Sequence, residues 1–152
     1  MATQKDLDKC YIQMTKTVAQ LSKAVRKKVG CVLVTPENGM LAAYNGTPSG
    51  WDNCCEDVHV TDDPHFSPTE VLHTKGDVIH AELNAILHAA RQGVSIKGST
   101  IYISLSPCLK CSAMIAQAGI KRVVYAEEYR DLSGVSKLLE HGIIVEKYSE
   151  TD

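Results

Sequence analysis

The chain has 152 residues, of which 44% are hydrophobic and 22% charged, and its formal net charge is -2. This is the length of one ordinary domain, and the charge does not favour binding to a long nucleic-acid polyanion. No run approaches the ~20 apolar residues of a membrane span, and residues 1–9 are polar and lack a signal core. We therefore expect a single domain over 1–152 in the cytoplasm, with no membrane contact and no stable nucleic-acid complex.

The first half of the chain predicts a helix followed by a β-hairpin. Apolar residues recur at helical spacing near 5–22. Two strand patterns over 30–35 and 40–45 flank a turn at 36–39, whose Asn-Gly pair is a strong hairpin signal. Residues 50–78 contain the single Trp and three of the six histidines, and we expect them to form a long irregular insertion within the domain.

The second half alternates between helical and strand patterns. This order is typical of a three-layer α/β/α domain built on a mixed sheet, here with five strands. The final strand–helix–strand unit is expected to be parallel. The predicted elements are a helix ending at Gly93, a strand over 100–105, a helix from Ser106-Pro107 to Gly119, a strand over 122–126, a helix over 133–141 and a strand over 143–148.

Potential metal ligands lie at the predicted starts of two helices. His80 opens one helix, and Cys108 and Cys111 share a face at the start of another. One His and two Cys supply three of the four ligands of a catalytic zinc and leave the fourth position for water. Glu82 is not needed as a ligand and is placed to shuttle protons. The pattern H-x-E followed by P-C-x-x-C, complete here with Pro107, is the zinc-deaminase motif.

Each feature of this motif also has a simpler explanation. A C-x-x-C pair alone is often redox-active or structural, and these cysteines share a stripe with the apolar Ile115. His80 alone fits a helix cap, and Glu82 alone fits a solvated first-turn acid. All four together favour a catalytic zinc site, whereas a zinc-stabilised binding module without catalysis is the alternative outside enzymes. Glu82 distinguishes the two, because a structural zinc site needs no acid beside an open position.

Three stretches carry a resemblance to a known family. They are YNGTPSGWDNCCED (44–57), HAELNAILHAARQG (80–93) and TIYISLSPCLKCSAMIAQAGIKRVVYAEEYRD (100–131). With them the chain resembles the deoxycytidylate (dCMP) deaminases of the cytidine-deaminase superfamily, in particular those of bacteriophages. The resemblance implies a cytidine-deaminase-like fold and a zinc-dependent conversion of dCMP and water to dUMP and ammonia, upstream of thymidylate synthesis.

Other substrates of the same superfamily stay open. They are dCTP, another free nucleotide, or an adenosine in tRNA. The near-neutral charge and the motif over 44–50 disfavour a tRNA substrate. The residues do not distinguish dCMP from dCTP.

The resemblance also implies roles for individual residues. His80, Cys108 and Cys111 would hold Zn2+, and Glu82 would shuttle protons. The substrate would be bound by Asn45 at the deoxyribose, Arg26 at the phosphate, Leu105 and Ser106 beside the base, and Tyr129 in the pocket wall. From the sequence alone, Asn45 also fits a turn residue and Arg26 a surface charge.

Regulation is a further implication of the resemblance. The family is typically a homohexamer, activated by dCTP with Mg2+ and inhibited by dTTP. The effector site would include Tyr44 and Gly46, and Arg91 resembles a position that couples the effector to activity. Arg91 also fits a helix C-terminal cation favoured by the helix dipole.

Some phage members carry a second, structural zinc. Here Cys54 or Cys55 with His65 or His73 could supply its ligands. The sequence departs from that pattern at Ala24, where the family has a ligand. Buried thiols and loop histidines are the alternative explanation.

Overall fold

The computed structural model describes the whole chain except residues 62, 63, 66, 68 and 152. The helices are α1 (Gln4–Ala19), α2 (Ala81–Gln92), α3 (Leu109–Gln117) and α4 (Ser133–Glu140). The strands are β1 (Gly30–Val34), β2 (Met40–Tyr44), β3 (Glu56–Thr61), β4 (Thr69–Thr74), β5 (Thr100–Leu105), β6 (Arg122–Glu127) and β7 (Ile144–Lys147).

The main sheet has five strands in the order β2-β1-β5-β6-β7. β1 pairs antiparallel with β2 and with β5, whereas the β5–β6 and β6–β7 pairs are parallel. The predicted hairpin between β1 and β2 is confirmed, and Asn38 adopts the positive φ of 66° that its turn requires. The predicted mixed sheet with a parallel final unit is therefore confirmed.

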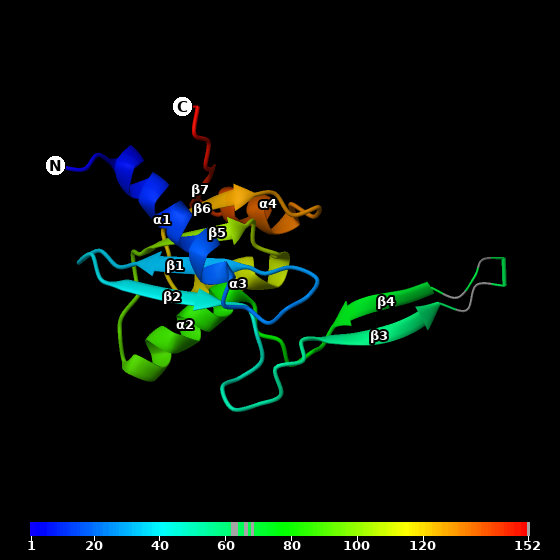
Figure 1. Ribbon diagram of the computed structural model, residues 1–152. Helices are drawn as coiled ribbons and strands as arrows, with labels where there is room; N and C mark the ends of the chain where they lie inside the picture. Colours follow the sequence, from blue (N-terminus) through cyan, green and yellow to red (C-terminus); the bar gives the residue numbers. More distant parts are fainter. Residues whose placement is uncertain (62–63, 66, 68, 152) are drawn as a thin grey trace.

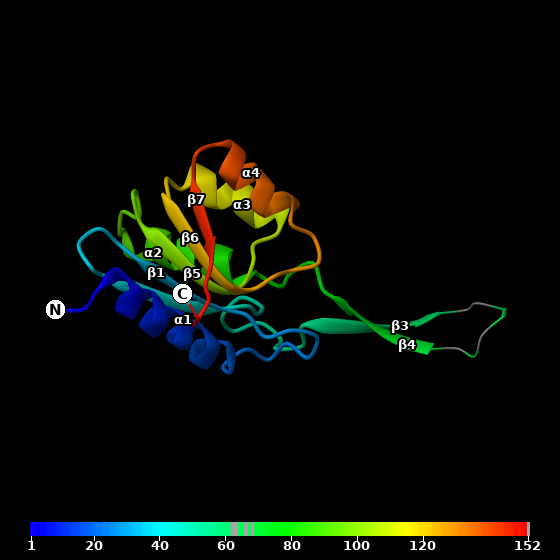
Figure 2. The same cartoon turned by 90° about the horizontal axis from the view of Figure 1, so that it is seen from above.

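Helices cover both faces of this sheet. α1 lies on one face, and α2, α3 and α4 lie on the other (Figure 2). Successive β1 residues alternate between the layers: Cys31 and Leu33 pack toward α2, and Val32 packs toward α1. β5 repeats this alternation with Ile101 and Tyr102. The predicted three-layer α/β/α architecture is therefore confirmed. A strand covered on both faces buries side chains in both directions, which is why these strands carry apolar residues at successive positions. No helix in the described part of the chain has the length and hydropathy of a membrane crossing.

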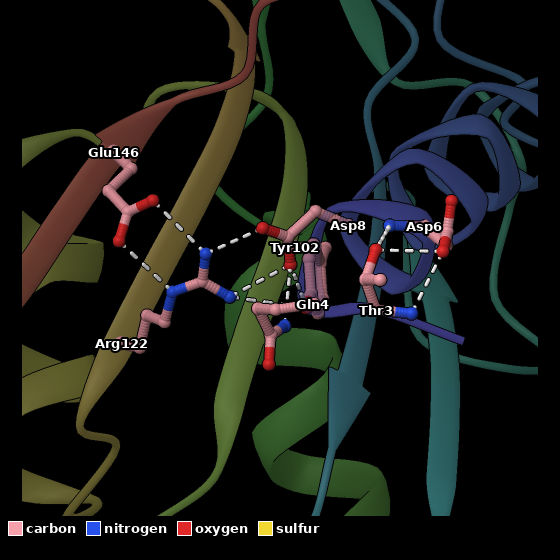
Figure 3. A network of polar contacts seen from close by, with 7 residues as sticks. All are labelled: Thr3, Gln4, Asp6, Asp8, Tyr102, Arg122 and Glu146. Carbon is pink, nitrogen blue, oxygen red and sulfur yellow. Dashed lines mark hydrogen bonds and ion pairs between the residues drawn. The ribbon is translucent and has the colours of Figure 1, made fainter. Parts of the chain in front are cut away.

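A polar network ties α1 to the far edge of the sheet (Figure 3). Arg122 on β6 donates two hydrogen bonds to Asp8 of α1, at 2.7 and 2.9 Å, and two to Glu146 of β7, at 3.1 and 3.2 Å. The Tyr102 hydroxyl of β5 donates to the same Asp8 at 2.7 Å. A bidentate guanidinium–carboxylate pair fixes geometry as well as charge, so Arg122 joins three elements that are distant in sequence.

The expectation that the insertion over 50–78 is irregular is wrong for Glu56–Thr61 and Thr69–Thr74, which form strands. β3 and β4 pair antiparallel from Glu56–Thr74 at the base to Thr61–Thr69, and this hairpin arm extends away from the body of the domain (Figures 1 and 2). In EDVHVT, Val58 and Val60 alternate with polar residues, whereas TEVLHT places Val71 beside Leu72. All residues of both strands are exposed except Glu56 and Leu72. The neighbouring Cys, Trp and Pro residues concealed that alternation.

The predicted start of α3 is also wrong. The N-cap is Cys108, not Ser106, and the first helical residue is Leu109. Ser106 instead follows the last residue of β5 and still pairs with β6, because its backbone N–H donates to the Glu127 carbonyl. Its hydroxyl accepts from the backbone N–H of Tyr129 at 2.7 Å. The shift matters because it places a sulfur atom at the helix cap.

Candidate active site

Three metal-ligand side chains meet where two helices begin. His80 is the N-cap of α2, Cys108 is the N-cap of α3, and Cys111 lies in the first turn of α3. Nδ1 of His80 is 3.6 Å from Sγ of Cys108 and 3.3 Å from Sγ of Cys111. All three ligand atoms lie within 4.8 Å of one another, and they form the only such group among the described residues.

This spacing fits zinc. A nitrogen at 2.0–2.1 Å and a sulfur at 2.3 Å from one tetrahedral ion lie about 3.6 Å apart. The two measured nitrogen–sulfur distances, 3.3 and 3.6 Å, are close to that value. A donor set of one imidazole and two thiols also matches the preference of zinc for nitrogen and sulfur, and three protein ligands leave one position open.

The local electrostatics favour a thiolate at Cys108. Hydrogen bonds from Cys111 and His80 lower the pKa of Cys108 to about 3. The hydrogen bond to Cys108 and burial raise the pKa of Cys111, and the hydrogen bond to Cys108 raises the pKa of His80. The backbone N–H of Cys111 also donates to Sγ of Cys108 at 3.5 Å, as expected at the positive end of a helix. The surroundings of Cys108 thus favour its deprotonated, metal-binding form.

Glu82 lies in the first turn of α2, two residues after His80, and is only 4% exposed. Burial raises the pKa of Glu82 to about 7. A carboxyl group with a pKa near neutrality both accepts and releases protons at physiological pH, which is what a general acid–base group requires.

These groups open onto one cavity of about 230 Å³. His80, Glu82 and Cys108 line it, whereas the buried Cys111 lies outside the lining set. All five residues expected at the substrate line it too: Arg26, Asn45, Leu105, Ser106 and Tyr129. The fold therefore gathers residues from both halves of the chain around the metal ligands.

The Asn45 amide organises the wall of this cavity. Its Oδ1 accepts a hydrogen bond from the backbone N–H of Val29 at 2.9 Å, and its Nδ2 donates to the carbonyl of Lys27 at 2.9 Å. Both ends of the side chain thus bind the segment that leads into β1. An amide oxygen has a second lone pair and an amide nitrogen a second hydrogen, so both atoms keep capacity for a ligand.

Arg26 and Tyr129 are each held by a residue from another element. Nη1 of Arg26 donates to the Thr74 hydroxyl at 3.2 Å. The Tyr129 backbone is fixed by Ser106, and its ring lies 5.7 Å from the guanidinium carbon of Arg130. The cavity walls are therefore braced from outside the metal site.

Several lining residues were not expected from the sequence. Glu56 and Thr74 come from the hairpin arm, while Lys27 comes from the segment before β1 and forms an ion pair with Glu127 at 2.8 Å. The alternation of Val58 and Val60 with polar residues in β3 was the signal that could have indicated the arm. The lining residues missed were Ala24, Lys27, Val29, Glu56, Thr74, Val78 and Ala81.

The residues suggested for a second zinc do not gather in the described part of the chain. No group of three ligands there includes Cys54, Cys55, His65 or His73. Sγ of Cys54 donates to the Glu56 carbonyl at 3.3 Å, and the His73 ring packs against that of His59 with centroids 4.5 Å apart. Cys55 is buried, in agreement with a structural thiol.

The residues suggested for regulation lie near α2. The Tyr44 carbonyl accepts from Nδ2 of Asn84 at 3.0 Å, and Gly46 forms a β-bridge with Ile79 just before the helix. Arg91 is exposed in the last turn of α2. Tyr44 and Gly46 are thus connected to the helix that carries His80 and Glu82.

Comparison with known proteins identifies a family for this site. Residues 5–127 match the model of the cytidine and deoxycytidylate deaminase zinc-binding region. The deoxycytidylate deaminase of Enterobacteria phage T4 is 37% identical over 148 residues, spanning 78% of this chain and 76% of that protein. The human deoxycytidylate deaminase is 39% identical over 117 residues, spanning 74% and 61%.

A solved structure extends this similarity to the fold. The crystal structure of dCMP deaminase from cyanophage S-TIM5 in complex with dCMP and dUMP has a TM-score of 0.82 and 37% identity, covering 97% of this chain and 100% of that one. The family match spans His80, Glu82, Cys108 and Cys111, which together form the site described above. The chain belongs to the cytidine and deoxycytidylate deaminase zinc-binding family.

Proposed function

We propose that the protein is a zinc-dependent hydrolase that converts dCMP and water to dUMP and ammonia. The observation that carries the proposal is that the His80–Cys108–Cys111 cluster lies at one cavity, which His80, Cys108 and the buried Glu82 line. Similarity to phage and human deoxycytidylate deaminases, and to a structure that holds dCMP and dUMP, supports this substrate.

Glu82 has the central chemical role in this proposal. Zinc held by the three ligands would supply the Lewis acidity that makes water a nucleophile near neutral pH. Glu82 accepts the proton of the water that attacks C4 of cytosine and delivers it to ring nitrogen N3. It then takes the proton of the new C4 hydroxyl and delivers it to the exocyclic nitrogen, so that the C4–O double bond forms as the C4–N bond breaks and ammonia leaves.

The remaining cavity residues bind and orient the nucleotide. Leu105 and Ser106 border the base, and Tyr129 closes the wall beside it. Asn45 hydrogen-bonds the deoxyribose through its remaining donor and acceptor capacity. Arg26 contacts the 5′-phosphate. All five line the same cavity as Glu82, which supports a single bound nucleotide.

Regulation by nucleotides belongs to the same proposal. dCTP with Mg2+ activates the enzyme and dTTP inhibits it, through a site that includes Tyr44, Gly46 and Arg91, in a homohexamer that acts in the cytoplasm. The hydrogen bond from Asn84 of α2 to the Tyr44 carbonyl supports a mechanical connection between this region and the helix of Glu82.

A substrate panel tests the proposal. The zinc-loaded protein is assayed by the loss of cytosine absorbance on dCMP, dCTP, deoxycytidine and cytidylate, each with and without dCTP or dTTP as effector where the pair is compatible. We expect the highest kcat/KM on dCMP. Preferential turnover of dCTP would assign the alternative free-nucleotide activity, and no turnover of any of the four would contradict the proposal.

A further inference from the structure

The base of the hairpin arm holds Arg26 from two directions. Glu56 and Thr74 are directly opposite each other in the register of β3 and β4. Oε1 of Glu56 accepts hydrogen bonds from the backbone N–H groups of Val25, at 2.9 Å, and of Arg26, at 3.2 Å. The Thr74 hydroxyl accepts from Nη1 of the Arg26 side chain at 3.2 Å. One pair of residues on the arm thus fixes both the backbone and the guanidinium of Arg26.

The segment that carries Arg26 depends on such contacts for its shape. Residues 22–29 join α1 to β1 without regular structure, and the N–H groups of four of them, Ala24, Val25, Arg26 and Val29, donate to side chains instead of to helix or strand partners. Ser22 accepts from the N–H of Ala24, and Asn45 accepts from that of Val29. Glu56 satisfies the two N–H groups at the residues nearest the guanidinium, and it is the charged member of this set.

Because Glu56 is buried, its carboxylate needs hydrogen-bond partners. Glu56 is only 8% exposed, and a buried carboxylate is stable only when its oxygens are hydrogen-bonded. Two N–H groups donate to its Oε1, while the Arg26 guanidinium donates to Thr74. An arginine side chain loses considerable rotamer entropy when a ligand immobilises it. A guanidinium already held in place loses less on binding, which raises affinity for the anion it contacts.

We propose that Glu56 and Thr74 are positioning residues that hold Arg26 toward the substrate phosphate and so give the site its preference for a nucleotide over a nucleoside. The proposal rests on the proposed function, because it takes Arg26 as the phosphate contact. Neither residue acts on the reacting atoms. The hairpin arm is thereby a specificity element, since the first residue of β3 and the last residue of β4 form part of the cavity wall.

The test compares a nucleotide with its nucleoside. In Thr74→Val, which removes one acceptor with little change in volume, we expect KM for dCMP to rise about 3- to 10-fold, the effect of losing one hydrogen bond. We expect kcat on dCMP and kcat/KM on deoxycytidine to stay within about 2-fold. Thr69→Val on the same strand, at the outer pair with Thr61, is the matched control and should leave both substrates unchanged.

Glu56 variants separate an acceptor role from a charge role. Glu56→Gln keeps an oxygen for the two N–H groups and should raise KM for dCMP less than Glu56→Ala does. If the carboxylate instead only repelled the phosphate, both variants would lower KM, and the proposal would be overturned. Bound zinc and the thermal midpoint, measured on each variant, show that the metal site and the fold are intact.

A double-mutant cycle with Arg26→Gln shows whether Thr74 acts through the arginine. We expect Thr74→Val to add less than about 2-fold to KM for dCMP in the Arg26→Gln background. If Thr74→Val raised KM for dCMP in the Arg26→Gln background as much as it does in the wild type, the proposal would be overturned. An equal loss of kcat/KM on deoxycytidine would overturn it too.

Product affinity distinguishes this inference from the proposed function. The same variants are titrated with dUMP and deoxyuridine by calorimetry, which needs no turnover. If the wild-type protein binds dUMP more tightly than deoxyuridine but does not deaminate dCMP, the proposed function fails. The positioning role is then still tested by the effect of Thr74→Val on the ratio of these two affinities. If Thr74→Val leaves the ratio of the two affinities unchanged, the positioning role fails whatever the activity.

Discussion

Sγ of Cys111 lies 3.3 Å from Nδ1 of His80, although 31 residues separate the two in the chain. The contact exists because α2 and α3 begin at the same place, one at His80 and the other at Cys108. Two positive helix ends therefore lie at the metal-binding atoms, and the thiolate form is favoured at Cys108, whose pKa is lowered. A metal ion bound there joins the N-termini of two helices, so metal binding and stability should be linked.

Removal of zinc should destabilise the protein. A ligand that binds only the folded state at 1,000 times its dissociation constant contributes about 4 kcal/mol to the free energy of unfolding. We expect a chelator to lower the thermal midpoint and abolish turnover, with Zn2+ but not Mg2+ restoring both. Cys111→Ala should lose zinc by elemental analysis, while Cys10→Ala, at an exposed cysteine, should retain it. Equal zinc content in the two variants would contradict the assignment.

Gly134 should be essential for the geometry of the metal site. A Cβ at this position would lie 2.5 Å from Oγ of Ser112, 2.7 Å from the carbonyl carbon of Cys108 and 2.7 Å from the carbonyl oxygen of Pro107. Two of these neighbours are backbone atoms of the turn that carries Cys108, so the helices must move apart. Alanine normally favours a helix by about 0.5–1 kcal/mol over glycine, yet we expect Gly134→Ala to destabilise by about 1–3 kcal/mol.

Urea unfolding and zinc affinity check this prediction together. Gly76→Ala is the control, because a Cβ there has no heavy atom within 4 Å. A Gly134→Ala protein with wild-type stability and wild-type zinc affinity would show that α3 and α4 are less closely packed than described.

The metal ligands could be predicted because local pattern determines them. Cys108 and Cys111 are three residues apart at a helix start, and His80 and Glu82 open another helix, so the motif itself carries most of the geometry. The layered fold was also predictable, since strands such as Gly30–Val34 are apolar on both faces and the helices follow the 3.6-residue period. What the pattern did not give is the position of the cap, which belongs to Cys108 rather than Ser106.

The rest of the site depends on contacts between residues far apart in sequence. Arg26 contacts Thr74 across 48 residues, and its backbone contacts Glu56 across 30. No periodicity in a single segment carries such information. The arm was missed because the neighbouring Cys, Trp and Pro residues concealed its short alternation. Its apolar residues also belong to no core, since Val58 and Val60 are each 57% exposed. The close approach at Gly134 is likewise a tertiary effect.

Arg122 should be a major contributor to stability remote from the site. Its side chain is 13% exposed and pairs with that of Asp8, which is 14% exposed. Removing it leaves Asp8 partly buried without its cation, which costs about 2–3 kcal/mol. We expect Arg122→Met to lower the urea midpoint accordingly with kcat unchanged. Lys137→Met, which breaks the exposed Lys137–Glu140 pair, should have little effect, and equal losses in the two variants would contradict this view.

The same network predicts how stability depends on pH. Burial by itself raises the pKa of Asp8, but hydrogen bonds from Arg122, Tyr102 and Gln4 outweigh it and lower that pKa below the ordinary value of 3.8. A carboxyl group whose pKa is lower in the folded state stabilises that state above its unfolded pKa, and the contribution is lost as the pH falls through the folded pKa. The contribution of Asp8 to the free energy of unfolding should therefore be fully present at pH 6 and decrease below about pH 4.

Urea unfolding of the wild type and Asp8→Asn at pH 6 and pH 3 measures this dependence. The difference between the two proteins should be largest at pH 6 and shrink at pH 3, and any loss of zinc in acid is common to both. A difference that grows on acidification would reverse the sign of the proposed contribution.

The most direct test of the account is zinc content and turnover measured on one preparation of Glu82→Gln. Glutamine keeps the shape of the buried side chain but cannot accept and return a proton, and loss of a general acid–base group lowers kcat by about 10²- to 10⁴-fold. We predict one zinc per chain, as in the wild type, with turnover of dCMP reduced by that factor. Wild-type turnover in this variant would contradict the account, because the deamination would then proceed without the carboxyl group assigned to carry its protons.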